Sequence, residues 1–488
     1  MTNAISVALS PKRIVIIGGG IGGLACAFRL RQRLPDASII LVDAAARLGG
    51  AVQTITDEGL VLELGPDSLV RTKPAALTLI GDLGLSDHLQ ATSPAARSSL
   101  IARGNRLVPV PEGLYLMAPG KLWPFAWSRL ISWRGKLRML QDLFIPPRIS
   151  DDDESLASFV RRRLGREALD RIAQPLISGI YTADPEQLSL AATMPQFLSM
   201  ERTYGSLLLA MRARMREQPV AQAAGPRYGL FASLRGGLGR LITTLSERLL
   251  SARVELRSGC KATGIRRMAD GTWQVAVEDL AVADLADAGS ATGQTLIADA
   301  IVIAGPAWAA SALLRDVDAD FSGLLARIPY AGVATVNLVF RRDQMPKLPN
   351  AAGFVVPAIE GRSLIACTFS SQKWAERTPD EFLVLRAFVG GALHAHYLDR
   401  DDPTMISAVL RDLRDLLQIQ AEPVRTLVTR WPRAMAQYHV GHLARVAAIR
   451  AGEKQLPGLA LIGNGYEGVG IPDIIAQADL AAQRLAGG

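Results

Sequence analysis

Cysteine is scarce in this chain of 488 residues, which contains Cys26, Cys260 and Cys367 and no others. The three are scattered, so they form neither the spacing of a metal site nor a disulfide framework. This pattern suits a reducing cytoplasm, in which each thiol packs as a small apolar side chain. The histidines include the close pair His394 and His396, but no third ligand lies near them in the sequence. We therefore predict no metal site.

Long apolar runs are also missing, although 49% of the residues are apolar. No stretch reaches the ~18 unbroken apolar residues that a membrane-spanning helix needs. The nearest, 300–314, is interrupted by Gly305 and Pro306 and predicts a strand, a turn and a helix. No secretory signal precedes the first apolar run, so we do not expect export. The net charge of +8 accompanies no recognisable nucleic-acid-binding module, so no nucleic-acid partner is expected.

The most informative feature that is present is a glycine-rich turn near the amino terminus. The apolar run 14–17 predicts a short buried strand, and a helix is expected at about 24–34. Three glycines with the spacing G-x-G-x-x-G lie between them: Gly18, Gly20 and Gly23. A second apolar run, 39–42, ends at Asp43. Strand, glycines, helix, second strand and terminal acid in this order favour a dinucleotide site over a purely structural glycine turn.

Each part of this pattern has a physical role. The first glycine permits the tight turn, the second lets the backbone approach a pyrophosphate, and the third lets the helix pack on the strand. The helix N-terminus offers unpaired N–H groups and the positive end of its dipole to the phosphates. Asp43 is placed to accept hydrogen bonds from a ribose.

Four further segments carry a family resemblance. They are Arg47-Leu-Gly-Gly50, Leu62–Ser68, Pro175–Ser189 and Gly463–Asp473. The first two resemble the flavoproteins of the amine oxidase and protoporphyrinogen oxidase superfamily. The third contains Ser-Gly-Ile-Tyr-Thr-Ala-Asp-Pro and the fourth Gly-Val-Gly-Ile-Pro-Asp, both similar to oxygen-dependent porphyrinogen oxidases. Because the resemblance covers nearly the whole chain, the chain is identified as a member of the protoporphyrinogen/coproporphyrinogen oxidase family.

The resemblance implies a non-covalently bound FAD. In the family the acid after the second strand holds the adenosine ribose, and a residue near Val254 contacts the adenine through its backbone. The helix that begins near Asp473 can stabilise negative charge on the reduced flavin. The residues expected along the cofactor are Gly18, Gly20, Gly22, Gly23, Asp43, Ala44, Arg47, Gly49, Gly50, Gly65, Pro66, Asp67, Ser68, Val254, Gly305, Gly463, Asn464, Val469, Gly470 and Ile471.

The resemblance also implies a porphyrinogen substrate. Arg71 is expected to pair with a propionate, the carbonyl of Gly179 to face the reacting methylene bridge, and Trp374 to stack on a pyrrole. The alternatives are a surface salt bridge for Arg71 and ordinary packing for Trp374. The expected reaction is hydride transfer to flavin N5, loss of a pyrrole N–H proton and reoxidation by dioxygen. Three such rounds remove six electrons and release hydrogen peroxide.

The expected fold class is α/β. A discontinuous Rossmann-like FAD-binding domain takes 1–90, 232–310 and 425–488, a mainly helical, membrane-associating domain takes 91–231, and a mixed-sheet substrate-binding domain takes 311–424. Strands are expected at 254–256, 264–265, 273–277, 296–304, 334–340, 353–357, 364–370 and 382–390, helices at 240–250 and 473–485, and a hairpin tip at 282–297.

Aromatic and basic residues interleave in 112–145, which includes Trp123, Trp127 and Trp133. This pattern predicts a peripheral membrane surface, with rings at the headgroup level and cations on anionic lipid. The rim of an apolar substrate pocket is the alternative interpretation. The expected location is cytoplasmic, peripheral on the inner face of the cell membrane. A ferrochelatase that receives the product and a second copy of the chain are the further partners considered.

Other functions are disfavoured by particular residues. Amine oxidases of this fold usually carry a lysine on the strand that corresponds to 330–340, where this chain has none, and Tyr466 could supply one ring of their aromatic cage. Carotenoid desaturases lack the segment that begins at Ser178. A flavin-binding protein without turnover stays open. Between substrates, the apolar, tryptophan-rich helical region favours protoporphyrinogen IX, whereas Lys73 and the basic balance favour coproporphyrinogen III. We expect oxidation of protoporphyrinogen IX to protoporphyrin IX, with coproporphyrinogen III as the alternative substrate.

Overall fold

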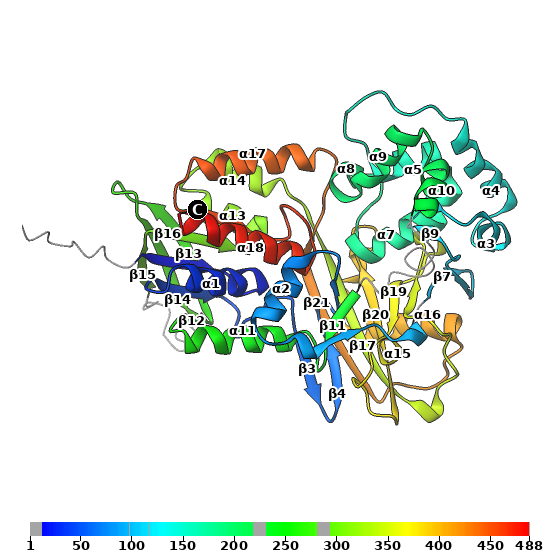
Figure 1. The fold of residues 1–488 in the computed structure, drawn as a ribbon. Helices are drawn as coiled ribbons and strands as arrows, with labels where there is room; N and C mark the ends of the chain where they lie inside the picture. Colours follow the sequence, from blue (N-terminus) through cyan, green and yellow to red (C-terminus); the bar gives the residue numbers. More distant parts are fainter. Residues whose placement is uncertain (1–11, 97, 116, 218–230, 281–292, 488) are drawn as a thin grey trace, which may run out of the picture.

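The computed structural model describes residues 12–96, 98–115, 117–217, 231–280 and 293–487. Most of the hairpin tip expected at 282–297 lies outside the described residues. The described chain forms a cofactor-side sheet with its helices, a second large sheet, and a group of helices drawn in cyan to green at the upper right of Figure 1. This arrangement is the mixed α/β architecture that the sequence predicts.

A five-stranded sheet with the order β12-β2-β1-β16-β22 forms the first layer. Its strands are β1 (Arg13–Ile17), β2 (Ser38–Asp43), β12 (Glu255–Ser258), β16 (Ala300–Ala304) and β22 (Leu459–Ile462). Every neighbouring pair is parallel, so the carboxyl ends of the strands meet at one edge. The central strands are buried because helices or further strands cover both faces, as parallel sheets require.

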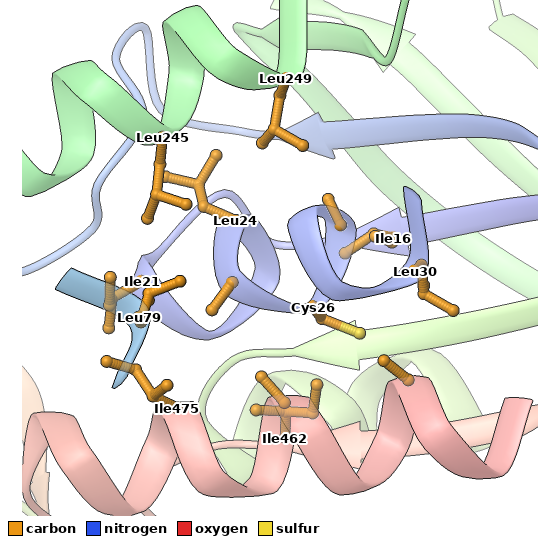
Figure 2. Packing of buried hydrophobic residues seen from close by; sticks show 14 of the residues in the cluster. Ile16, Ile21, Leu24, Cys26, Leu30, Leu79, Leu245, Leu249, Ile462 and Ile475 are labelled. Atoms are coloured by element: carbon orange, nitrogen blue, oxygen red, sulfur yellow. The ribbon is translucent and has the colours of Figure 1, made fainter. Parts of the chain in front are cut away.

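Three helices build the core on one face of this sheet. They are α1 (Ile21–Arg33), α11 (Gly239–Ser251) and α18 (Ile471–Leu485). Figure 2 shows α1 between the other two, with Leu24 directed toward Leu245 of α11 and Ile475 on α18. All three side chains are fully buried. This packing holds the N-termini of α1 and α18 near the carboxyl edge of the sheet.

The opposite face carries an antiparallel meander and further helices. The elements are β13 (Cys260–Arg267), β14 (Trp273–Asp279), β15 (Gly293–Ala298), α13 (Ala307–Leu314), α14 (Ala319–Ala326) and α17 (His442–Lys454). The single strand expected at 296–304 is wrong, because it divides at Asp299 into β15 and β16. Asp299 accepts hydrogen bonds from the backbone and guanidinium of Arg13, and the chain changes partner there from β14 to β1.

A seven-stranded mixed sheet has the order β21-β17-β20-β19-β18-β7-β8. Its elements are β7 (Ser99–Arg103), β8 (Arg106–Pro109), β17 (Tyr330–Arg341), β18 (Gly353–Val355), β19 (Leu364–Phe369), β20 (Phe382–Gly390) and β21 (Arg425–Ala436), with α15 (Ser370–Lys373) and α16 (Asp402–Leu417) packed against it. The domain boundaries expected at residues 91 and 425 cut through this sheet, since β7, β8 and β21 all belong to it.

The mainly helical region therefore begins after β8 rather than at residue 91. Its helices are α3 (Leu122–Trp127), α4 (Trp133–Leu140), α5 (Leu156–Arg163), α6 (Arg166–Ala168), α7 (Gln174–Tyr181), α8 (Leu190–Thr193), α9 (Pro195–Tyr204) and α10 (Leu207–Glu217). Small elements that join the layers are β3 (Thr54–Asp57), β4 (Leu60–Glu63), β5 (Leu69–Val70), β6 (Leu89–Ala91), β9 (Leu114–Tyr115), β10 (Ala118–Pro119), β11 (Phe231–Leu234) and α2 (Pro74–Asp82). None of the helices in the described ranges is long and apolar enough to span a bilayer.

The substitution Gly23→Ala should destabilise the ligand-free protein, whereas Gly323→Ala should not. The two glycines lie inside α1 and α14, where alanine is intrinsically favoured by about 1 kcal/mol. A Cβ at Gly23 would come 1.9 Å from the carbonyl oxygen of Gly18, while nothing lies within 4 Å of one at Gly323. We expect Gly23→Ala to lower the free energy of unfolding by about 1–3 kcal/mol. Urea unfolding measures both variants, and equal stabilities would contradict this packing.

Candidate cofactor and substrate site

Three glycine turns meet at the carboxyl edge of the parallel sheet. Gly18, Gly305 and Gly463 directly follow β1, β16 and β22. A Cβ on Gly18 would lie 2.2 Å from the carbonyl oxygen of Ala304, and one on Gly463 would lie 2.3 Å from that of Gly305. The chain can pass this closely only without side chains at these positions. The turns therefore form a continuous strip of bare backbone along the edge.

The N-terminus of α1 opens onto this strip. Gly20 is its N-cap, no side chain caps the helix, and no acid lies in its first turn. A Cβ placed on Gly20 or on Gly305 would meet no atom within 4 Å. Open backbone beside the positive end of a helix dipole fits a phosphate-bearing group. Gly22 and Gly23 face the other way, against Ile474 and the carbonyl oxygen of Gly18 respectively, so they serve packing.

Asp43 is held at the end of β2 by backbone donors. Its Oδ2 accepts a hydrogen bond of 2.5 Å from the N–H of Gly19, and its Oδ1 accepts one of 2.7 Å from the N–H of Ala45. The side chain is half-buried, and the neighbouring Ala44 is exposed. Each carboxylate oxygen keeps further acceptor capacity. The acid is therefore fixed where a ribose on the exposed side could donate to it.

The double-glycine turn lies against the first glycine loop. The N–H of Gly49 donates to the carbonyl oxygen of Gly19 at 2.7 Å. Arg47 donates to the carbonyl oxygens of Leu48 at 3.0 Å and Gly50 at 2.8 Å. Both glycines have positive φ angles, 106° at Gly49 and 57° at Gly50. In this structure Arg47 shapes the turn, and burial lowers the pKa of its guanidinium despite the nearby Asp43.

The segment Gly65–Ser68 is tied into a buried charge network. A Cβ on Gly65 would lie 1.7 Å from the carbonyl oxygen of Ala51, and the carbonyl oxygen of Gly65 accepts a hydrogen bond from Arg386. The Asp67 carboxylate accepts bonds of 2.7 and 2.9 Å from Lys373 Nζ and one of 2.8 Å from Ser68. Pro66 lies between these anchors, half-buried.

The charges around Asp67 decide its protonation. Burial by itself would raise the pKa of Asp67, but the cations of Lys373 and Arg386 outweigh it and hold the pKa well below its usual range. Glu63 shows the opposite balance: burial raises its pKa although Arg377 lies 3.2 Å away. Asp67 is thus a carboxylate whose bonds are taken up within the protein. Neither Lys373 nor Arg386 belongs to a motif, so the sequence did not reveal them.

Trp374 is not an open aromatic face. Its side chain is 1% exposed, and its Nε1 donates to Asp67 at 3.3 Å. Lys373 Nζ and the guanidinium of Arg377 each lie 5.1 Å from its ring centroid. The expectation that this ring stacks on a pyrrole is not supported, because the ring is enclosed by the charge network. The alternative, ordinary packing beyond the end of β19, describes its surroundings.

Arg71 and Lys73 lie between β5 and α2 and differ in their partners. Arg71 is exposed and has no ion pair among the residues that the structure describes. Lys73 pairs with Asp473 at 2.5 Å, next to the start of α18. The alternative interpretation of Arg71 as half of a surface salt bridge is therefore not observed. Its guanidinium is available for a carboxylate from outside the protein.

The segment around Gly179 forms the end of α7. Residues 174–178 are buried, whereas Gly179 and Ile180 are exposed, the latter to 41%. The helix ends at Thr182 with φ at 50°, an unusual conformation for a β-branched residue. The carbonyl oxygen of Thr182 accepts a bond of 2.8 Å from the N–H of Ala392. The turn is thus held from outside the helix, and Gly179 faces away from the core.

The carboxyl-terminal loop is supported by residues that no motif indicated. Asn464 donates to the carbonyl oxygen of Ala434 at 2.7 Å, and its own carbonyl oxygen accepts a bond of 2.8 Å from the hydroxyl of Tyr438. The remaining expected residues lead into α18 or lie at the edge strand β12: Val469, Gly470, Ile471 and Val254. Val254 is buried directly before β12 and beside the start of β2, because Glu255 pairs with Ile40 and Ser258 pairs with Asp43. The register therefore places Val254 away from the carboxyl edge at which Asp43 lies.

Tyr466 does not fit the aromatic cage of an amine oxidase. Its side chain is 1% exposed and belongs to the hydrophobic cluster formed by β16, α13, α14 and α17. Its hydroxyl makes no hydrogen bond to the described residues. The ring is therefore part of the protein interior, which agrees with the absence of a lysine from β17.

Comparisons with known proteins agree on one family. The profile of the flavin-containing amine oxidoreductases matches residues 21–486. Coproporphyrinogen III oxidase of Bacillus subtilis (strain 168) is 34% identical over 475 residues, covering 96% of this chain and 97% of that protein. Protoporphyrinogen oxidase of Bos taurus is 29% identical over 500 residues, covering 98% of each. A crystal structure from Exiguobacterium sp. 255-15, provisionally named protoporphyrinogen oxidase, has a TM-score of 0.85 and 32% identity, covering 98% and 99% of the two chains.

Asp67→Asn should lower the free energy of unfolding of the cofactor-free protein by about 3–5 kcal/mol near neutral pH, because buried cations lose their counter-charge. The native pKa of Asp67 lies below that of an unfolded aspartate, about 4. Its stabilisation is therefore complete above that value and is lost as the pH falls toward the native pKa. Urea unfolding at a series of pH values measures the difference between variant and wild type.

The matched control is Asp343→Asn. The Asp343 side chain is 67% exposed and lies 3.5 Å from Arg341, so its removal should change stability by less than about 1 kcal/mol at every pH. The difference in the free energy of unfolding between Asp67→Asn and wild type should become smaller in acid. A difference that stays constant would contradict the assignment of Asp67 as a buried carboxylate.

Proposed function

Since the chain belongs to the flavin-containing amine oxidoreductase family, within its protoporphyrinogen/coproporphyrinogen oxidase group, we propose that it oxidises coproporphyrinogen III to coproporphyrin III. Membership makes the protein an FAD-dependent oxidoreductase of porphyrin biosynthesis. The bacterial coproporphyrinogen III oxidase has the higher identity, 34% against 29% for the bovine protoporphyrinogen oxidase. This ranks coproporphyrinogen III first, the reverse of the order that the sequence alone favoured.

The observation that carries the proposal is a meeting of three parts of the fold. Tyr181 from α7, Val355 from β18, Tyr330 from β17 and Val469 from the carboxyl-terminal loop all pack, partly buried, against the same hydrophobic cluster. Gly179 is exposed near the end of α7, two residues before Tyr181. An apolar wall beside the cofactor edge suits a large tetrapyrrole, whose recognition depends mainly on apolar area and a few polar anchors.

We propose these roles for the residues of the site. The strip at Gly18, Gly305 and Gly463 and the start of α1 bind the phosphates, while Asp43 orients the ribose. Bound FAD supplies the hydride acceptor and passes the electrons to dioxygen, releasing hydrogen peroxide. The protein's part is to orient the substrate, with a carboxylate on Arg71 and the methylene bridge near the carbonyl of Gly179.

Anaerobically prepared coproporphyrinogen III and protoporphyrinogen IX test the proposal directly. Each is mixed with the purified holoenzyme and air, and porphyrin fluorescence is followed. We expect faster oxidation of coproporphyrinogen III, with dioxygen consumed. Faster oxidation of protoporphyrinogen IX would favour the second candidate, which the exposed tryptophans of α3 support. No oxidation of either substrate by protein with bound FAD would overturn the function.

Substitution of Arg71 accompanies this assay. Arg71→Gln should raise KM about tenfold with little change in kcat, because a charge-assisted bond to a carboxylate contributes about 1.5–3 kcal/mol to binding. The matched control is Arg315→Gln, an exposed arginine after α13 on the other side of the cofactor sheet. Equal KM values for the two variants would contradict the proposal that Arg71 binds the substrate.

We also propose that α3, α4 and the turn after them rest on an anionic lipid surface at the inner face of the cell membrane. Trp123, Trp127, Trp133 and Phe144 are 75%, 74%, 63% and 84% exposed, which is unusual for large apolar side chains. Arg129 and Arg134 are exposed beside them. Lys136, another basic residue of the segment 112–145, is buried and donates to the carbonyl oxygen of Ala126, so it does not face the lipid. The ferrochelatase partner and the homodimer stay predictions.

Sedimentation with vesicles of phosphatidylcholine and phosphatidylglycerol tests this surface. The triple variant Trp123→Ala, Trp127→Ala and Phe144→Ala should bind the vesicles at least about tenfold more weakly. Burying each ring in the lipid contributes about 1.5–3 kcal/mol to the free energy of binding. High salt should weaken wild-type binding. The matched control removes three exposed apolar side chains elsewhere: Leu250, Val424 and Leu480. Equal losses in both triple variants would refute a localised lipid surface.

A further inference from the structure

Residues 437–442, which we call the strap, form the connection between β21 and α17 (Figure 1). No motif marks them, yet the strap contacts both halves of the proposed site. On one side lies the segment that continues from α7, and on the other lies the carboxyl-terminal loop before α18.

Toward the helical region the strap makes both side-chain and backbone hydrogen bonds. Gln437 Nε2 donates to the carbonyl oxygen of Tyr181 at 3.2 Å. The N–H of Ser189 donates to the carbonyl oxygen of Tyr438 at 2.7 Å. Two more bonds run from strap N–H groups: Val440 to the carbonyl oxygen of Gln187 at 2.9 Å, and Gly441 to Asp153 Oδ2 at 2.9 Å. The strap is therefore hydrogen-bonded to the segment between Tyr181 and Ser189 and to Asp153.

Toward the cofactor loop the contact is concentrated on Tyr438. Its hydroxyl donates to the carbonyl oxygen of Asn464 and accepts from the N–H of Gly468, each at 2.8 Å. The ring is 2% exposed and stacks on His442, with centroids 3.8 Å apart and planes 13° from parallel. His442 Nε2 in turn lies 3.1 Å from the carbonyl oxygen of Tyr466. One phenol therefore bridges both ends of the loop 464–468.

The loop that this bridge spans is tightly folded. Gly468 has φ at 104°, and a Cβ there would lie 2.4 Å from the Asp473 carboxyl carbon, so the loop is tightly folded against the start of α18. Burial raises the pKa of Tyr438 well above its usual value, so the hydroxyl stays protonated and can donate while it accepts. Without this hydroxyl, the carbonyl oxygen of Asn464 and the N–H of Gly468, both in partly buried residues, would each lose a hydrogen-bond partner.

We propose that Tyr438 is a positioning residue for the cofactor, which holds the loop 464–468 in its binding conformation and ties it to the segment following α7. It acts from behind the loop and does not itself touch the cofactor. The inference rests on the proposed cofactor contacts of 463–471 and is independent of which porphyrinogen is oxidised.

The test compares two tyrosine-to-phenylalanine variants. Tyr438→Phe removes a hydroxyl with two hydrogen bonds, while Tyr466→Phe removes a buried hydroxyl of the same loop that has none. FAD is titrated into each FAD-free protein, and flavin fluorescence gives the Kd for FAD. Circular dichroism of the bound flavin reports the environment of its ring. We expect Kd to rise about tenfold or more for Tyr438→Phe, from about 1 kcal/mol for each lost bond, with an altered flavin signal. The Kd of Tyr466→Phe should stay within about twofold of the wild-type value, because loss of this hydroxyl leaves no hydrogen-bond partner unsatisfied among the described residues.

The outcomes separate positioning from plain stability. If Tyr438→Phe lowers the thermal stability of the FAD-free protein but leaves Kd and the flavin signal unchanged, the inference is overturned. If Tyr438→Phe does not fold, His442→Ala removes the ring that stacks on Tyr438 and holds it against the loop, so the Tyr438 hydroxyl is no longer fixed there and Kd should rise. An unchanged Kd for His442→Ala would also overturn the inference. Failure of the wild-type protein to oxidise porphyrinogens would not affect these readouts, so the two proposals fail separately.

Discussion

The close approach of backbone at the carboxyl edge of the parallel sheet is the constraint on which the rest of the structure depends. A Cβ at Gly23 would lie 1.9 Å from the carbonyl oxygen of Gly18, and one at Gly18 would lie 2.2 Å from that of Ala304. Side chains here would push α1 off the sheet and separate β1 from β16. Because α18 packs on α1, its N-terminus would move as well. The glycines thus set the positions of both helix N-termini that face the proposed cofactor.

Sequence patterns predict those parts of the fold whose cause is local. The run 382–390 is apolar except for Arg386 and ends in glycine, and β20 has these same bounds. The helix expected from residue 473 begins at Ile471, because Pro472 is tolerated in a first turn. In contrast, β21 gives no strand signal: its twelve residues include Pro432 and three arginines. It forms because it lies at the edge of the sheet, where proline and half-exposed polar residues are acceptable.

The residues of the site likewise fall into those that a local sequence pattern predicts and those that it does not. Glycine turns, Asp43 and the double glycine can be recognised because each is contained within a few residues. The groups that hold them cannot, because they come from distant segments: Arg386 reaches Gly65 across 321 positions and Lys373 reaches Asp67 across 306. Burying these charges costs desolvation, which their mutual pairing offsets. Trp374 illustrates the consequence, since a ring expected to face the substrate is instead enclosed by this network.

A cofactor domain assembled from separated segments needs connections that keep its halves aligned. The parallel sheet aligns the nucleotide-binding edge through β1, β16 and β22, but the proposed substrate wall is supplied by α7 and the second sheet, which have no strand in common with it. Alignment between the two must therefore come from side chains and connections. The charge network around Gly65 and Asp67 makes one such link, and the strap at 437–442 makes another. A flavoprotein that depends on orientation more than on acid–base groups has most to gain from this kind of rigidity.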